Sequence, residues 1–262
     1  MKGRKRYGSD IKDKQWALIA PLLPAESPIG RPRTTDLREV MNALRYMSRA
    51  GCQWDMLPSE FPPRSTVYGY FKQWRDEGIL DEIVVKLRKT IRIKAGRGVT
   101  PTAAIIDSQS VKTTGSDYDV GYDGGKKIKG RKRHIAVDIL GLLLTVVVHS
   151  AGIQDRAGAK LVGFNLLQYF SGLKIIFADG GYTGSALSDW FSTVVNVVLK
   201  IVKRPRKKFQ IVKFRWIVER TFGWFNTHRR LSKDYETSPR SSEAWVKLAS
   251  IHMILNRCAA TK

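Results

Sequence analysis

The sequence contains little cysteine and few histidines. Cys52 and Cys258 are the only two cysteines among 262 residues, and neither belongs to a Cys-x-x-Cys pair or to a zinc-finger spacing. The four histidines are scattered, so they form no recognisable zinc motif. We therefore expect two free thiols in a reducing compartment, with neither a disulfide framework nor a structural zinc ion.

Long hydrophobic runs are also missing. The most apolar stretch, residues 139–148, contains Gly141 and Thr145 and is far shorter than the roughly 20 residues that a transmembrane helix needs. Asp10 and Asp13 interrupt the basic N-terminus, and no small-residue cleavage site follows, which is unlike a secretory signal peptide. We expect a soluble, cytoplasmic protein without a membrane partner.

Acidic residues are outnumbered by basic ones. The chain has 46 Lys and Arg against 23 Asp and Glu, a formal net charge of +23, and an isoelectric point near 10.2. Such a surplus is typical of proteins that bind polyanions, because basic side chains neutralise phosphates and release counterions. A basic protein of the ribosomal type would share this charge. However, 43% hydrophobic residues and seven Trp indicate a substantial folded core.

Residues 1–98 have the pattern of a small all-helical domain. We expect helices over residues 11–23, from a cap at Thr35, and from a cap at Ser65 to a stop at Gly78. The link between the second and third helices is too long for a helix-turn-helix, whose turn has three or four residues. The basic residues of this region that best suit phosphate contact are Arg31, Arg33, Arg64 and Lys72.

From Thr102 onward, strand patterns alternate with helical patterns. Strands are expected over residues 103–106, 134–140, 142–149, 174–178 and 197–202. Helices are expected over residues 157–169, over residues 185–191, and from about Val212. This order predicts that residues 99–262 form an α/β domain with a mixed central sheet flanked by helices, in which functional sites gather at strand ends.

Three acidic residues stand out in this pattern. Asp107 follows the first expected strand, Asp179 follows the fourth, and Glu219 lies inside the last amphipathic helix. If the two strands are neighbours, the carboxylates converge, and such a trio can hold two divalent metal ions for phosphodiester chemistry. Each acid also has a simpler explanation. Either aspartate can belong to a turn, and Arg215 with Glu219 can form a helical ion pair worth roughly 0.2–0.5 kcal/mol.

Basic residues flank these acids. Residues 126–133 contain six basic side chains in eight positions, and residues 203–208 contain five in six. Runs of this kind form either solvated loops or surfaces that hold phosphates without reading sequence. Two further acids, Asp138 and Asp155, can be either additional metal ligands or structural groups. At helical spacing, one stripe of the last helix carries Arg215, Glu219, Phe222, Asn226 and Arg230.

Several segments together resemble a known family. They are Ile-Asp-Ser-Gln-Ser-Val-Lys at 106–112, Ala-Asp-Gly-Gly-Tyr at 178–182, and Arg-Trp-Ile-Val-Glu-Arg-Thr-Phe at 215–222. Upstream segments 51–54 and 61–68 fit the same comparison. The chain resembles, over nearly its whole length, the DDE transposases of bacterial insertion sequences, in the insertion-sequence-five-like group of the insertion-sequence-four-like superfamily.

The resemblance implies a fold, a reaction and a set of site residues. It implies an RNase H-like core preceded by a helical region that binds DNA ends. It also implies that Asp107, Asp179 and Glu219 bind Mg²⁺ or Mn²⁺, with two ions in the site. In the family pattern Tyr-x2-Arg-x3-Glu-x6-Lys, Arg215 and Glu219 match, whereas Val212 and Asn226 replace the Tyr and the Lys. The role of those two in gripping DNA could then pass to His228, Arg229 and Arg230.

The implied partner is double-stranded DNA, both element ends and target, held by a homodimer or higher homo-oligomer in the bacterial nucleoid. We expect DNA contacts from Arg64, Lys112, Lys126, Lys127, Lys129, Arg131, Lys132, Arg133, Arg215, Arg220, Arg229 and Arg230. Two other functions fit the same residues. One is a metal-dependent nuclease or junction resolvase, which cuts DNA and never joins it. The other is a DNA-binding regulator derived from a transposase with an inactive site.

Overall fold

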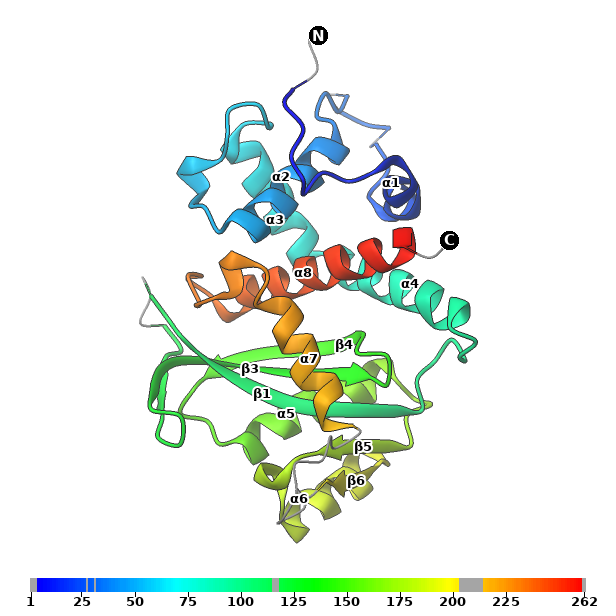
Figure 1. Ribbon diagram of the computed structural model, residues 1–262, viewed down its shortest axis with the longest axis vertical. Coiled ribbons are helices and arrows are strands. Elements are labelled where there is room, and N and C mark those ends of the chain that lie inside the picture. The colour runs from blue at the N-terminus through cyan, green and yellow to red at the C-terminus, as the bar shows by residue number, and fades with distance from the viewer. Residues whose placement is uncertain (1–3, 27, 31, 115–117, 203–213, 261–262) are drawn as a thin grey trace.

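The computed structural model describes residues 4–26, 28–30, 32–114, 118–202 and 214–260. A helical layer forms one end of the molecule, and a sheet with helices on both faces forms the other (Figure 1). The elements before the sheet are α1 (Asp13–Ile19), η1 (Ala20–Leu22), α2 (Leu37–Ala50), η2 (Trp54–Met56), α3 (Arg64–Asp76) and α4 (Ile79–Lys94). The strands are β1 (Ala103–Lys112), β2 (Gly121–Asp123), β3 (Ile128–Asp138), β4 (Leu143–Ser150), β5 (Ile175–Ala178) and β6 (Val198–Ile201). The other elements are α5 (Asp155–Tyr169), η3 (Gly180–Tyr182), α6 (Ser185–Trp190), η4 (Phe191–Val195), α7 (Arg215–Phe225), η5 (Arg229–Leu231) and α8 (Pro239–Ala260).

The three expected N-terminal helices are present, with two corrections to their caps. Asp36, and not Thr35, caps α2, because its side chain accepts a hydrogen bond from the Arg38 N–H at 2.7 Å. Helix α3 begins one residue before Ser65, and its N-cap is Pro63. The sequence analysis missed α4, whose buried face packs on the sheet and on α8.

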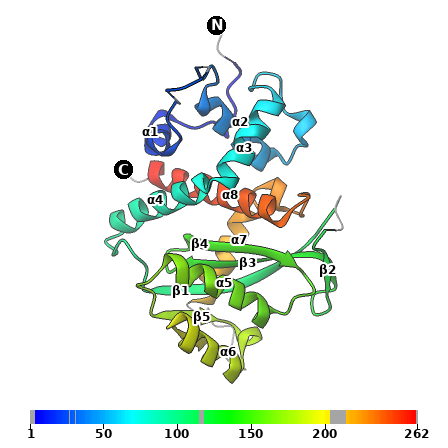
Figure 2. The ribbon, with the colours of Figure 1, turned by 180° about the vertical axis from the view of Figure 1, so that it is seen from behind.

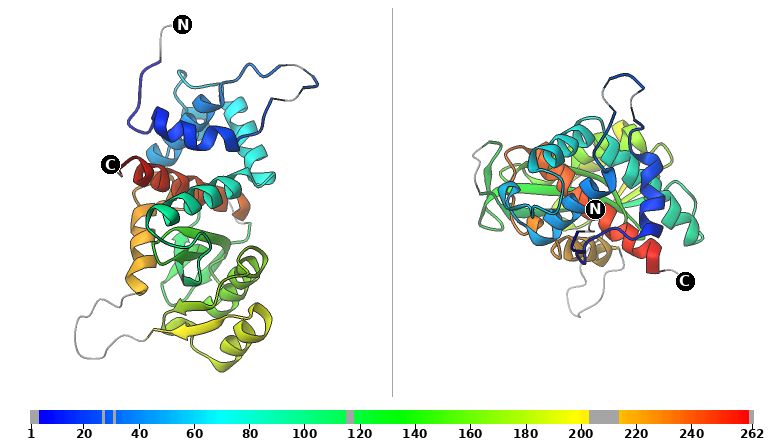
Figure 3. Two further views of the ribbon diagram at one scale, coloured as in Figure 1. Left: turned by 90° about the vertical axis from the view of Figure 1, so that its right-hand side faces the viewer. Right: turned by 90° about the horizontal axis from the view of Figure 1, so that it is seen from above.

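Helix α8 is the second element that the sequence analysis missed. The single last helix expected from about Val212 is instead α7, a short connection, and α8. Figure 3 shows α8 between the N-terminal helices and the sheet, and its Trp245, Ile251 and Leu255 are buried there in a core shared with both. The boundary at residue 98 stays a prediction. Within the described ranges, no helix is both long enough and apolar enough to cross a membrane.

The sheet is mixed, as predicted. The strand order is β2-β3-β1-β5-β6, and β4 pairs with β3. The β1–β3 and β3–β4 pairs are antiparallel, whereas β1–β5 and β5–β6 are parallel. Strand β1 extends to Lys112, six residues beyond the expected end, because its polar second half continues to pair with β3.

Side chains alternate between the two faces of the sheet. In β1, Ile105 belongs to the core under α7 and α8, whereas Ala104 and Ile106 belong to the core under α5 and α6. Figure 1 shows α7 crossing the front face, and Figure 2 shows α5 on the opposite face. By the same alternation, Asp107 faces α7 and Ser108 faces α5.

Candidate active site

Asp107 and Asp179 lie side by side on neighbouring strands. The last registered pair of β1 and β5 is Ile105 opposite Phe177, and each aspartate comes two residues later, so both face α7. Their separation of 72 residues (179 minus 107) therefore equals the register of the two strands. Asp107 lies in the middle of β1 and not at its end, which corrects the sequence analysis. The candidate site lies where β5 stops and β1 continues.

Each aspartate is held by a short backbone hydrogen bond. Asp179 ends β5 and caps η3, where its Oδ1 accepts from the Gly181 N–H at 2.8 Å. Asp107 Oδ1 accepts from the Ser108 N–H at 2.7 Å. These bonds orient one oxygen of each carboxylate.

Helix α7 brings the third acid to the same face. Glu219 is exposed, and its Oε1 accepts from Arg215 Nε at 2.8 Å. A second guanidinium nitrogen of Arg215 lies 3.7 Å from Asp179 Oδ2. The ion pair expected between Arg215 and Glu219 is present, and it links α7 to the end of β5. A small cavity under Arg215 is lined by Asp107, Asp179 and Val218.

Electrostatics favour a cation at this place. The pKa of Asp107 is raised to about 6: burial is the largest cause and the nearby Asp179 adds to the rise, while the Ser108 N–H, Lys126 and Arg215 oppose it. The donors are carboxylate oxygens, which suit hard divalent ions such as Mg²⁺. Arg215 already places a positive charge between Asp179 and Glu219. The residues therefore fit a divalent cation, although no three metal-binding side chains of the described ranges are close enough together to share one ion.

A buried chain of hydrogen bonds anchors the turn that follows Asp179. The Ser150 carbonyl can only accept, so His149 donates to it through Nδ1 at 2.9 Å. The Nε2 atom of His149 then accepts from His134 Nδ1 at 3.0 Å, and His134 Nε2 accepts from the Tyr182 hydroxyl at 2.7 Å. Burial, and secondly His149, lower the pKa of His134 to about 3, so the chain is neutral at physiological pH.

The expected DNA contacts divide into exposed and buried residues. The exposed ones are Arg64, Lys112, Lys126, Lys127, Lys129 and Arg229. Arg220 is partly buried, and its guanidinium carbon lies 4.2 Å and 4.5 Å from the ring centroids of Trp216 and Trp224. Arg64 forms an ion pair with Asp55.

Four of the residues expected to contact DNA are buried, because the fold uses them internally. Arg131, Lys132 and Arg133 are buried in β3, with exposed fractions of 0%, 4% and 2%. Arg230 is also buried, 2.8 Å from Glu236 and stacked over Trp245. Each cation bonds to carbonyl or carboxylate oxygens of its own chain, and a phosphate cannot reach it without local unfolding.

Of the stripe of residues expected along one side of the last helix, only Arg215 and Glu219 lie together as predicted, in the first turn of α7. Phe222 is buried, and α7 ends at Phe225, so Arg230 lies outside the helix. His228 is buried too, with Nδ1 2.8 Å from Ser48 Oγ, so it is not a substitute for the family Lys. Val212 and the basic residues 203–208 lie outside the described residues.

Both spare acids have structural partners. Asp138 pairs with Arg92 and accepts from the N–H groups of Leu140 and Leu142, which closes the β3–β4 turn. Asp155 accepts from Ser108 Oγ at 2.9 Å and from Lys132 Nζ at 2.8 Å. The contribution of Asp123, which also faces Lys132, was missed, although Asp-Gly-Gly-Lys is a recognisable turn signal.

Comparisons with known proteins agree with this geometry. A family described as "Putative transposase of IS4/5 family" matches residues 11–84, and "Transposase DDE domain" matches residues 99–254, more than half of the chain. The DDE match and the observed sheet together confirm the RNase H-like α/β fold. Transposase DDE domains generally use divalent metal ions.

Two relatives show more limited similarity. One is "Uncharacterized protein y4sN" of Sinorhizobium fredii, 29% identical over 79 residues, which cover 30% of this chain and 63% of that protein. The other is "Putative transposase for insertion sequence element IS402" of Burkholderia cepacia, 28% identical over 131 residues, which cover 45% of this chain and 60% of that protein. This chain thus spans less than two thirds of the length of either relative. By its two family matches, the chain belongs to the DDE transposases of the IS4/5 family.

Proposed function

We propose that this protein binds the terminal inverted repeats of its element, cuts the DNA there, and joins the freed ends to a target. One observation carries the proposal. Asp107 and Asp179 stand in register on parallel strands facing α7, and Arg215 links Asp179 to Glu219 on that helix. Three separate elements thereby each direct one carboxylate to the same edge of the sheet, with Arg215 lying between Asp179 and Glu219.

Asp107, Asp179 and Glu219 would hold two Mg²⁺ or Mn²⁺ ions. Such ions, when bound, activate the attacking water or 3′-hydroxyl and stabilise the leaving oxygen of an in-line displacement. Asp107, whose pKa is raised to about 6, would bind a metal ion in its deprotonated form. Arg215, which now pairs with Asp179 and Glu219, would be a donor for a phosphate oxygen once those carboxylates held metal ions.

The surplus of positive charge supports DNA as the partner. The exposed Lys112, Lys127, Lys129 and Arg229 would hold the backbone by phosphate contact, which positions DNA without reading its sequence. Two ends must be held together for joining, so the active assembly is a homodimer or a higher homo-oligomer. Its place of action is the bacterial nucleoid, in the cytoplasm.

The test is a cleavage and joining assay with labelled DNA that carries the ends of the element. Wild type is compared, with Mg²⁺ or Mn²⁺, with Asp107→Asn, Asp179→Asn and Glu219→Gln. Asp189→Asn, an exposed acid on α6, is the matched control. Each site variant should lose at least about a hundredfold in cleavage rate, because metal-assisted charge stabilisation is worth several kcal/mol. End binding, measured by gel shift, should persist.

The products separate the alternative functions. Cut ends without joined products indicate a nuclease or resolvase, and end binding without cleavage under either metal indicates an inactive regulator. Full cleavage by a site variant removes that residue from the site.

A further inference from the structure

The tip of the β2–β3 hairpin, residues 124–127, folds back onto the strand that carries Asp107. Ser110 Oγ donates to Asp123 Oδ2 at 2.5 Å. Lys126 Nζ donates to the carbonyl of Ser108 at 3.2 Å. Through Ser110 the hairpin therefore contacts the α5-facing side of β1, and through Lys126 it reaches the backbone next to Asp107.

Two glycines allow this close contact. A Cβ at position 130 would lie 2.0 Å from the Val111 carbonyl oxygen, and one at position 121 would lie 2.1 Å from Ser150 Oγ. Real Cβ atoms do not approach backbone atoms so closely, so only glycine fits here. Gly130 thus permits the close approach of β3 to β1, and Gly121 permits the close approach of β2 to Ser150 and Gly152.

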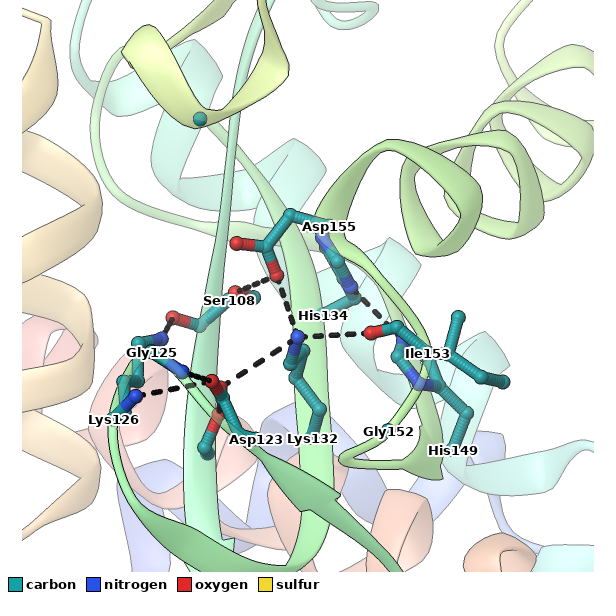
Figure 4. A network of polar contacts seen from close by, with 12 residues as sticks. Ser108, Asp123, Gly125, Lys126, Lys132, His134, His149, Gly152, Ile153 and Asp155 are labelled. Carbon is teal, nitrogen blue, oxygen red and sulfur yellow. Dashed lines mark hydrogen bonds and ion pairs between the residues drawn. The ribbon is translucent and has the colours of Figure 1, made fainter.

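A polar network fixes the turn at the hairpin tip. Asp123 Oδ1 accepts from the N–H groups of Gly125 and Lys126, both at 3.1 Å. Figure 4 shows Lys132 between Asp123 and Asp155, with its Nζ 3.7 Å from Asp123 Oδ2 and 2.8 Å from Asp155 Oδ1. A buried cation thereby ties the hairpin to the N-terminus of α5.

The network keeps its acids ionised. Burial alone would raise the pKa of Asp155, but hydrogen bonds from Lys132 and Ser108 outweigh it and lower that pKa. For Asp123, the hydrogen bonds from Ser110 and Lys126 and the charge of Lys132 likewise outweigh burial. The acids that hold the tip, Asp123 and Asp155, are thus paired with Lys132. In contrast, the Lys126 ammonium is exposed, and it donates to the neutral carbonyl of Ser108.

We propose that Lys126 is a catalytic residue whose ammonium contacts a non-bridging oxygen of the phosphate being cut, and that Asp123, Lys132 and Asp155 position it. This inference rests on the proposed function. It gives the Gly124-Gly125-Lys126 turn a role in catalysis at the reacting phosphate, in addition to non-specific contact with the DNA backbone.

The Lys126 ammonium would stabilise the negative charge of the transition state. In the displacement, the attacking oxygen bonds to phosphorus, its proton passes to solvent, the bond from phosphorus to the leaving 3′-oxygen breaks, and this oxygen takes a proton from solvent to form the 3′-hydroxyl. Negative charge is carried by the phosphoryl oxygens in the transition state. A donor that is already oriented stabilises this charge without reorganisation, and loss of one such donor typically costs about 10²–10³ in rate.

The first test separates binding from chemistry at saturating DNA. Lys126→Gln should cleave about a hundredfold more slowly than wild type, with an end-DNA dissociation constant changed less than about threefold. Lys126→Arg keeps the charge and should recover part of the rate. Asp123→Asn should lose rate in the same direction, with thermal unfolding curves used to confirm that it is folded.

Lys174→Gln is the matched control. This substitution removes the same charge from another exposed lysine. Lys174 precedes β5 and so lies at the opposite end of that strand from Asp179. Its rate should equal that of wild type. An unchanged rate for Lys126→Gln, or an equal loss in Lys174→Gln, overturns the proposal.

A second test does not need catalysis, so it remains informative if the protein cuts nothing and the proposed function fails. DNA is prepared with a thiol tether on the phosphate at the junction between the element end and flanking DNA. Lys126→Cys should form a disulfide with this DNA, whereas Lys174→Cys and the wild type, with its native Cys52 and Cys258, should not. Absence of the Lys126→Cys cross-link overturns the placement of Lys126 at the reacting phosphate.

Discussion

The two halves of one basic run have opposite environments. Lys126, Lys127 and Lys129 are exposed at and beside the hairpin tip, whereas Arg131, Lys132 and Arg133 are buried in β3. Composition does not distinguish them, because both halves carry three positive charges within four residues. The difference is that the second half is covered on both faces of the sheet.

The buried residues Arg131, Lys132 and Arg133 link β3 to other segments of the chain by hydrogen bonds. Arg131 donates to the carbonyls of Tyr118, Glu236 and Thr237, and Arg133 donates to those of Leu231 and Lys233. Lys132 points to the other face and donates to the Ile153 carbonyl and to Asp155. Period-two alternation thus directs two arginines to the segment after α7 and one lysine to the start of α5.

The largest effect is expected at Arg131. Arg131→Ala should reduce the free energy of unfolding by about 3–5 kcal/mol, because it leaves buried acceptors and Asp234 without their cation. Urea unfolding followed by circular dichroism measures this change. A loss below about 1 kcal/mol would show that Arg131 is not a structural tie and would reopen its assignment to DNA.

Substitution of Asp107 should instead increase the free energy of unfolding, measured by the same urea unfolding. The folded-state pKa, raised to about 6, lies above the ordinary value of 3.8, so the folded protein loses stability as the pH rises through this interval. Asp107→Asn removes that loss and should stabilise the metal-free protein at pH 8 by roughly 3 kcal/mol, while abolishing cleavage.

The pH dependence is the control for this prediction. At pH 4 the carboxyl is protonated in the folded protein and the two proteins should unfold at similar urea concentrations. If the stabilisation is equally large at pH 4, burial of the ionised carboxylate is not its cause.

The sequence predicted the strand cores before Asp107 and Asp179 well and the surroundings of these two residues poorly, for physical reasons. Asp107 and Asp179 follow apolar strand cores, so periodicity located both, and the register of β1 with β5 explains their spacing. The polar residues after Asp107 resemble a loop, and only pairing with β3 reveals that the strand continues. Three partners of Arg131, namely Asp234, Glu236 and Thr237, lie about a hundred residues away in the chain, where no local pattern can indicate them.

The smallest effect is expected at the exposed half of the basic run. Lys129 is solvent-exposed on β3, so Lys129→Ala should change the free energy of unfolding by less than about 0.5 kcal/mol. If it contacts one phosphate, its loss should reduce the slope of log affinity against log salt by about 0.9. The measurement is a salt titration of DNA binding. An unchanged slope would place Lys129 outside the interface and confine the phosphate contacts of this run to the hairpin tip.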